Sequence, residues 1–158
     1  GAVRTLVSQL GPQSGLLLTA DHGVLDVPEH SHVLIDSDPA LVDGVRHIAG
    51  DPRCLQLHFE PDLSDAGRQQ LIERWRSAEG DRAWVATRDE AIAANWFGAV
   101  DAEVAPRIGD LLIAARKNIA YYDARDTNNH GRSMIGQHGS HTPAEVRVPL
   151  LRFGAFAR

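Results

Sequence analysis

Residues 16–23 read Leu-Leu-Leu-Thr-Ala-Asp-His-Gly, and this stretch decides the fold that we expect. The apolar run predicts a buried strand, which delivers Asp21 and His22 into the loop beyond its carboxyl end. In open α/β sheets, ligands bind at that edge. A carboxylate and an imidazole are also ligands that a divalent metal such as zinc accepts, so the stretch predicts part of a metal site.

A second histidine lies between glycines near the end of the chain, in Gly136-Gln137-His138-Gly139. The glycines let the backbone bend sharply and keep bulky side chains away from the imidazole, which suits a ligand at a crowded site. The sequence Thr-Pro-Ala-Glu at 142–145 then predicts a short capped helix, and residues 150–153 predict a closing strand. We therefore predict that His138 is a further metal ligand.

Composition limits what the chain can do. Its 158 residues are 43% hydrophobic, which is enough for one domain with a sizeable core. The net charge of -5 provides no basic surface for nucleic acid or for an acidic membrane, and no apolar run approaches the roughly 20 residues that span a bilayer. The single Cys54 excludes an internal disulfide and favours a reducing, cytoplasmic compartment, although a leader upstream of Gly1 stays open.

The stretch between the two motifs alternates strand and helix patterns. Residues 53–59 alternate polar and apolar side chains with the period of a strand that has one buried face. Ser64 caps a helix, and Thr87 with Glu90 forms the capping box of another. We expect strands at 53–59 and 83–86, helices at 64–78 and from 88 to near Gly98, and a hairpin formed by 110–115 and 118–122.

This order predicts an α/β fold: part of a central sheet with flanking helices, and an α+β subdomain inserted into it. We expect residues 1–31 to supply a sheet strand and the first metal motif, and residues 32–132 to form the inserted subdomain. Residues 133–158 then return to the core with the second metal motif.

Taken together, the motifs resemble a known family. Thr-Ala-Asp-His-Gly at 19–23, followed at 136–150 by Gly-x-His-Gly-Ser-x-Thr-Pro-Ala-Glu-x-x-Val-Pro-Leu, resembles the nucleotide pyrophosphatase/phosphodiesterase branch of the alkaline phosphatase superfamily. Residues 80–84 and 107–110 also resemble actinobacterial members of that branch. The resemblance covers essentially the whole chain. It implies the C-terminal part of an alkaline-phosphatase-like sheet, and two divalent metal ions, usually zinc, that act with a threonine or serine nucleophile on phosphodiesters and pyrophosphates.

The resemblance also assigns roles to residues. Asp21 and His22 match the ligands of the metal beside the nucleophile, and His138 matches a ligand of the metal that activates water. The family also has an early aspartate, the nucleophile and an Asp-x-x-x-His pair upstream of the Thr-Ala-Asp-His-Gly motif, and the eighteen residues before Thr19 supply none of them. The resemblance therefore implies a C-terminal fragment that is inactive alone. The chain departs from the family pattern at His141, where an apolar residue is usual.

Several polar residues have two interpretations. Asp26 follows the first motif closely, and it either orients a metal ligand or caps a loop. His141 is either an additional ligand beside His138 or an exposed side chain. His30 and His32 could ligate a metal as a His-x-His pair, but we expect them to be ordinary surface histidines.

The expected substrate is a small phosphodiester or nucleotide, with no recognition of nucleic acid and no membrane partner. One alternative is a non-catalytic metal-binding or regulatory module that retains the fold without the nucleophile. Another is a different hydrolase of the superfamily, namely a phosphomonoesterase, a sulfatase or a phosphonate hydrolase. If part of the sheet lies outside this chain, a homodimer could bury the exposed sheet edges and apolar faces.

Overall fold

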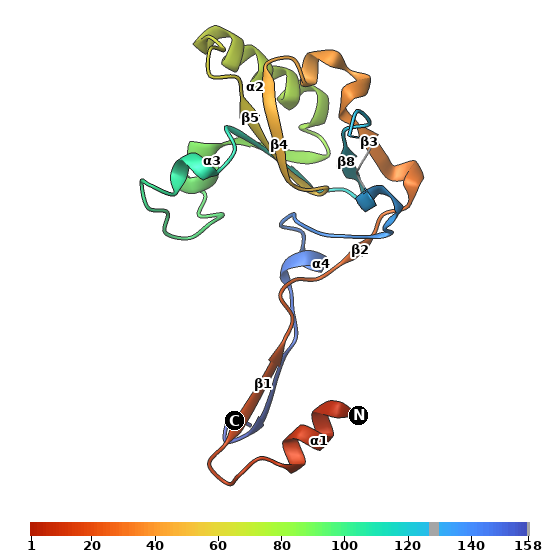
Figure 1. The fold of residues 1–158 in the computed structure, drawn as a ribbon, viewed down its shortest axis with the longest axis vertical. Coiled ribbons are helices and arrows are strands. Elements are labelled where there is room, and N and C mark those ends of the chain that lie inside the picture. Colours follow the sequence, from red (N-terminus) through yellow and green to blue (C-terminus); the bar gives the residue numbers. More distant parts are fainter. Residues whose placement is uncertain (127–129, 158) are drawn as a thin grey trace.

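A computed structural model describes residues 1–126 and 130–157 of the chain. Figure 1 shows a compact upper part and a narrow two-stranded ribbon that projects away from it. The helices and strands, in chain order, are α1 (Ala2–Ser8), β1 (Gly15–Thr19), β2 (Leu25–Asp26), β3 (His32–Leu34), β4 (Val45–Asp51), β5 (Cys54–Phe59), α2 (Asp65–Glu79), β6 (Ala83–Thr87), α3 (Arg88–Ala93), β7 (Leu111–Ala115), β8 (Ala120–Tyr122), β9 (Gly136–Gln137), α4 (Pro143–Val146) and β10 (Leu150–Gly154).

The compact part, residues 32–122, is called the sheet module below. Its four-stranded sheet has the order β4-β5-β7-β6, and every neighbouring pair is antiparallel. All five residues of β7 are buried because the strand lies between β5 and β6 and both of its faces are covered. β4 forms an open edge, and most of its residues are exposed.

Helix α2 covers one face of this sheet, and its bounds agree with the helix expected at 64–78. The Ser64 side chain accepts a hydrogen bond from the backbone N–H of Gly67 and caps the helix. Leu71 and Trp75 are buried against the sheet, and the Trp75 indole N–H donates to the carbonyl of Leu41 over 2.9 Å. The apolar helix face and its cap were therefore both readable from the sequence.

The other face of the sheet is covered by α3 and the segment that follows it. The capping box predicted for Thr87 and Glu90 is present. Ala91, Ile108 and Leu112 form the buried centre of this layer. The helix is shorter than the one expected to end near Gly98, because it stops at Ala93 and the backbone then takes a positive φ at Asn95.

The hairpin expected from residues 110–115 and 118–122 does not form. The first segment, β7, pairs with β5 and β6, whereas the second, β8, pairs in parallel with β3. Both segments are strands, as predicted, but their apolar patterns carry no information about which strands they pair with.

The first and last strands, β1 and β10, pair only with each other among the described residues, in an antiparallel ribbon that runs from Gly15↔Gly154 to Thr19↔Leu150. The prediction that 16–20 form a buried strand is half right. The strand is present, but Leu17 and Leu151 are about half exposed (51% and 47%). These leucines are exposed because no further strand or helix of the described residues covers that part of the ribbon (Figure 1).

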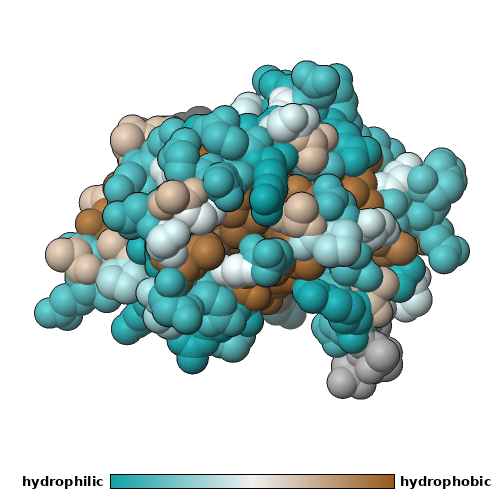
Figure 2. Space-filling view, turned by 90° about the horizontal axis from the view of Figure 1, so that it is seen from above, coloured by the Kyte–Doolittle hydropathy of each residue, from teal (hydrophilic) through white to brown (hydrophobic). Residues whose placement is uncertain are grey.

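The end of the molecule opposite the ribbon is mostly hydrophilic, with hydrophobic residues visible between the hydrophilic ones (Figure 2). Among the described residues, no helix has the length and apolar character required to cross a membrane.

Candidate metal centre

The two sequence motifs meet where the ribbon joins the sheet module. The backbone N–H of Gly23 donates to the carbonyl of Glu145 over 2.7 Å, and β2 pairs with β9 a few residues further on. A Cβ atom at position 23 would collide with the carbonyl oxygen of Ala144. Glycine is therefore required at this crossing, which holds the first motif against the second.

His22 and His138 stack on each other at this crossing. Their ring centroids lie 3.7 Å apart, and the ring planes are within 20° of parallel. Both side chains are partly open to solvent, at 38% and 37% exposure. Because the lone pair of an imidazole lies in its ring plane, two parallel rings offer neighbouring ligand positions rather than converging on one point.

His22 presents its Nε2 atom as the free ligand atom. Its Nδ1 lies 2.9 Å from the carbonyl oxygen of Gly23, and since a carbonyl only accepts, the proton of the neutral ring is on Nδ1. Nε2 lies 3.7 Å from an Asp21 carboxylate oxygen. Two ligands of a tetrahedral zinc ion lie about 3.3 Å apart, so these two atoms fit one ion after a small adjustment.

The carboxyl group of Asp21 is held in its charged form. Hydrogen bonds from the backbone, first of all the His22 N–H at 3.0 Å, place the pKa of Asp21 below its usual range, and the nearby His22 ring adds to the effect. A metal ligand must be deprotonated, so the local hydrogen bonds favour the binding form.

Asp51 also reaches this site, and the sequence did not single it out. It ends β4, and its carboxylate lies 4.0 Å from Nδ1 of His138. In the sequence it stands within Gly50-Asp51-Pro52, where an aspartate is an ordinary turn residue. No local pattern distinguishes it from other turn aspartates, so only the fold could identify it.

A buried ion pair fixes the segment after His138. Arg53 and Glu145 have side-chain exposures of 0% and 2%, and the guanidinium contacts both carboxylate oxygens, at 2.7 and 2.9 Å. Burial raises the pKa of Glu145, but hydrogen bonds from Arg53 and from its own turn outweigh this effect, and the net pKa lies below its usual range.

The same network ties the turn to the sheet. The backbone N–H of Ser140 donates to Glu145, and the Ser140 hydroxyl donates to the carbonyl of Ala115 over 2.6 Å. Arg53 also donates to the carbonyls of Lys117 and Ile119. The position of His138 is therefore set by the sheet module as well as by its own glycine-rich turn.

Three of the sequence-predicted residues lie elsewhere. The His141 ring packs against the indole of Trp96, with ring centroids 4.7 Å apart. Asp26 lies on the exposed side of β2, and its backbone carbonyl accepts from the Asn118 side chain. His32 is not a surface histidine, because its ring nitrogens are buried and its ring packs on Tyr122. The suggested roles of His141 and Asp26 toward a metal stay predictions.

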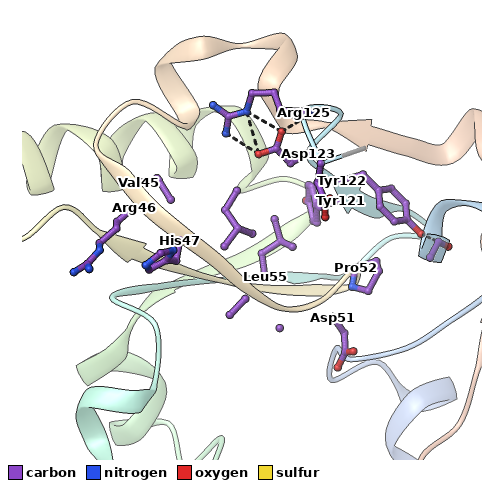
Figure 3. Close-up of a pocket in the computed structure, with 15 residues that line it drawn as sticks. Val45, Arg46, His47, Asp51, Pro52, Leu55, Tyr121, Tyr122, Asp123 and Arg125 are labelled. Atoms are coloured by element: carbon purple, nitrogen blue, oxygen red, sulfur yellow. Dashed lines mark hydrogen bonds and ion pairs between the residues drawn. The ribbon is translucent and has the colours of Figure 1, made fainter. Parts of the chain in front are cut away.

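A cavity of about 480 Å³ lies along the open edge of the sheet, between β4 and the segment after β8 (Figure 3). Tyr121 and Leu55 contribute to its buried floor, and Arg125 at its rim donates to both carboxylate oxygens of Asp123. Asp51 lines the end of this cavity nearest to His138. Its size suits a small ligand.

The donor set is incomplete for two ions. Across residues 1–126 and 130–157, no group of three or more His, Cys, Asp or Glu side chains is arranged to hold a metal. Asp21 and His22 have the donor atoms and nearly the spacing for one ion, and His138 is a single imidazole beside them. The chemistry and the protonation of these groups fit zinc, whereas their number falls short of a full coordination shell.

Comparison with known proteins gives consistent results. The sequence model of a family described as type I phosphodiesterase/nucleotide pyrophosphatase matches residues 1–141. No curated protein matches the chain.

Among solved structures, human ectonucleotide pyrophosphatase/phosphodiesterase 5 is 14% identical with a TM-score of 0.63, over 89% of this chain and 33% of that one. The mouse protein is 14% identical with a TM-score of 0.62, over 89% and 34%. Phosphonoacetate hydrolase from Sinorhizobium meliloti is 15% identical with a TM-score of 0.60, over 88% and 36%. At such identities the likeness shows the fold alone, and it confirms the expected fold class. The chain spans about a third of the length of these structures.

Proposed function

The chain belongs to the type I phosphodiesterase/nucleotide pyrophosphatase family, and on this premise we propose that it carries part of a two-metal centre that hydrolyses phosphodiester or pyrophosphate bonds. Asp21 and His22 hold one ion and His138 holds the other, with zinc as the favoured metal. The observation that carries this proposal is the stack of His22 on His138, because it brings two distant ligand motifs to one point.

The bound ions would supply the central chemistry, since two divalent ions about 3.5–4 Å apart clamp the attacking and leaving oxygens of a phosphoryl transfer. Contacts within the chain hold the proposed ligand side chains in the forms that bind a metal ion. Parallel rings, whose lone pairs lie in separate planes, suit one ligand for each ion. The Gly23 carbonyl holds His22 in the tautomer that leaves Nε2 free, and the lowered pKa of Asp21 keeps its carboxylate charged.

The proposed substrate is a small phosphodiester or nucleotide. The net charge of -5 gives the chain no basic surface to hold a nucleic acid polymer. The cavity is large enough for part of such a substrate, and one of its lining residues, Asp51, also lies 4.0 Å from His138.

By itself, the 158-residue chain is proposed to be inactive. A catalytic zinc ion takes about three protein ligands, and Asp21, His22 and His138 cannot complete two such shells. We expect no metal-dependent turnover of bis(4-nitrophenyl) phosphate by this chain. Measurable turnover that is abolished by a chelator would overturn this part of the proposal.

Zinc binding to the purified chain tests the centre itself. Titration calorimetry should show saturable binding by the wild-type chain and at least a tenfold weaker affinity for His22→Ala and for His138→Ala. His30→Ala is the matched control, because His30 is an exposed histidine away from the stack. No binding by the wild-type chain, or equal losses in all three variants, would contradict the proposal. If the whole protein binds zinc but hydrolyses no phosphodiester, the non-catalytic alternative holds instead.

We also propose that the chain forms a homodimer through the ribbon. Leu18 and Leu151 are paired on one face of the ribbon, at 37% and 47% exposure, and Leu17 is exposed on the other. Apolar side chains gathered on an open two-stranded sheet favour association, because burying them removes apolar surface from water.

A further inference from the structure

One carboxylate of the sheet module faces the proposed metal centre without belonging to either metal motif. We propose that Asp51 is a positioning residue for His138: its carboxylate accepts the Nδ1–H of the ring and so leaves Nε2 to the metal. The role of Asp51 toward a metal rests on the proposed function, whereas its position beside the His138 ring does not. It would make the sheet module a participant in the metal centre.

Backbone packing holds Asp51 at this place. Gly139, next to His138, has φ +120°, and a Cβ atom on it would lie 2.6 Å from the Cβ of Asp51. Only glycine at position 139 therefore allows the two segments to come so close. Arg53, two residues after Asp51, is locked to Glu145 on the other side of the same turn.

The distance between the Asp51 carboxylate and the His138 ring is slightly longer than a hydrogen bond, and a side-chain rotation can shorten it. Asp51 Oδ2 lies 4.0 Å from His138 Nδ1, whereas a hydrogen bond requires about 2.7–3.2 Å. The Asp51 side chain is 53% exposed, so it can rotate toward the ring without displacing packed neighbours. Figure 3 shows its carboxylate turned away from Leu55 and Tyr121, toward the segment that leads to α4.

In His22, which stacks on His138, the corresponding hydrogen bond from Nδ1 is already formed. His22 donates its Nδ1–H to the Gly23 carbonyl over 2.9 Å and keeps Nε2 free. The two rings are nearly parallel, and each has an oxygen acceptor near Nδ1. Metal-ligating histidines regularly donate their second N–H to such an acceptor, which fixes the tautomer and the ring orientation.

The test combines a readout that needs no metal with one that does. Nitrogen-15 NMR of the histidine side chains at fixed neutral pH reports the tautomer of His138 in Asp51→Ala, Asp51→Asn and the wild-type chain. We expect Nδ1–H in the wild type, a shift toward Nε2–H in Asp51→Ala, and an intermediate result for Asp51→Asn, whose amide oxygen still accepts. The His22 signals should not move, because its acceptor is a backbone carbonyl.

Zinc affinity is the second readout. Loss of an orienting partner typically weakens metal binding by about 10–100-fold, and we expect a loss in this range for Asp51→Ala. Asp62→Ala removes an equal charge from an exposed position of the sheet module and should change neither measurement. A thermal melt confirms that each variant is folded.

The outcomes separate the inference from the proposed function. If Asp51→Ala behaves like Asp62→Ala in both measurements, Asp51 does not position His138. If the wild-type chain binds no zinc, the proposed function falls, and the tautomer of metal-free His138 still decides whether Asp51 holds the ring.

Discussion

Replacing Arg53 by methionine should destabilise the chain far more than removing a comparable arginine from the surface. Methionine keeps an apolar stem of similar length but removes the guanidinium. The Glu145 carboxylate, with a side-chain exposure of only 2%, then loses hydrogen bonds of 2.7 and 2.9 Å to its counter-ion. The carbonyls of Lys117 and Ile119 lose their donor at the same time.

The expected cost follows from leaving a buried charge without its partner. Breaking a buried pair from one side typically costs about 3–5 kcal/mol, which is a large part of the roughly 5–15 kcal/mol that stabilises a domain. For a chain of this size the loss corresponds to a fall in Tm of about 6–20 °C. The matched control is Arg76→Met. Arg76 binds both oxygens of Glu90 at 2.7 and 2.8 Å, but with side-chain exposures of 35% and 52%, and its loss should cost below about 1 kcal/mol.

Urea unfolding followed by circular dichroism measures both variants against the wild type. The pH dependence adds a second check. Because the folded-state pKa of Glu145 is lowered, the pair stabilises the fold above the usual glutamate pKa of about 4.3, and this contribution is lost as the pH falls through the lowered value. The gap between wild type and Arg53→Met should therefore narrow in acid. Equal costs for Arg53→Met and Arg76→Met at neutral pH would refute the reasoning.

Two further predictions concern the crossing and the ribbon. Gly23→Ala should prevent the chain from closing around the His22–His138 stack, because its Cβ meets the Ala144 carbonyl, so we expect a lower Tm together with a loss of zinc affinity of at least tenfold. Gly98→Ala is its control, since no atom lies near a Cβ at that position and the cost should be confined to the positive φ. Sedimentation should show a dimer of the wild-type chain and a monomer of Leu151→Lys, and a monodisperse wild-type monomer would exclude the proposed dimer.

Local patterns were sufficient wherever neighbouring residues determine the structure. The helix at 64–78 follows from its Ser64 cap and an apolar face, and the capping box at Thr87 follows from two residues three positions apart. Strand pairing was not predictable in this way. Residues 120–122 pair in parallel with β3 rather than with β7, because the choice of partner strand depends on which surfaces remain to be covered after the helices have packed.

In the candidate site, too, the residues in local motifs were predictable and those brought in by the fold were not. Asp21, His22 and His138 stand in distinctive motifs, and the fold brings the two imidazoles together. Asp51 and Arg53 were missed as site residues because each is an ordinary member of a turn and strand. Their importance depends on Gly139 and Glu145, 88 and 92 residues further along the chain, and the complete burial of Arg53 has no signature in the residues next to it in the sequence.

The pairing of Thr19 with Leu150 has a consequence for recombination between relatives. The chain leaves the ribbon after Thr19 and re-enters it at Leu150, so residues 20–149 start and end at neighbouring points and can be exchanged as one cassette. Asp21, Asp51 and His138 all travel inside it. A chimaera with both crossovers in the ribbon would inherit the proposed metal ligands and the residues around them from one parent. A crossover between Asp51 and His138 would take these two residues from different parents, and the proposed contact would then survive only where both parents place an acceptor and a histidine at these positions.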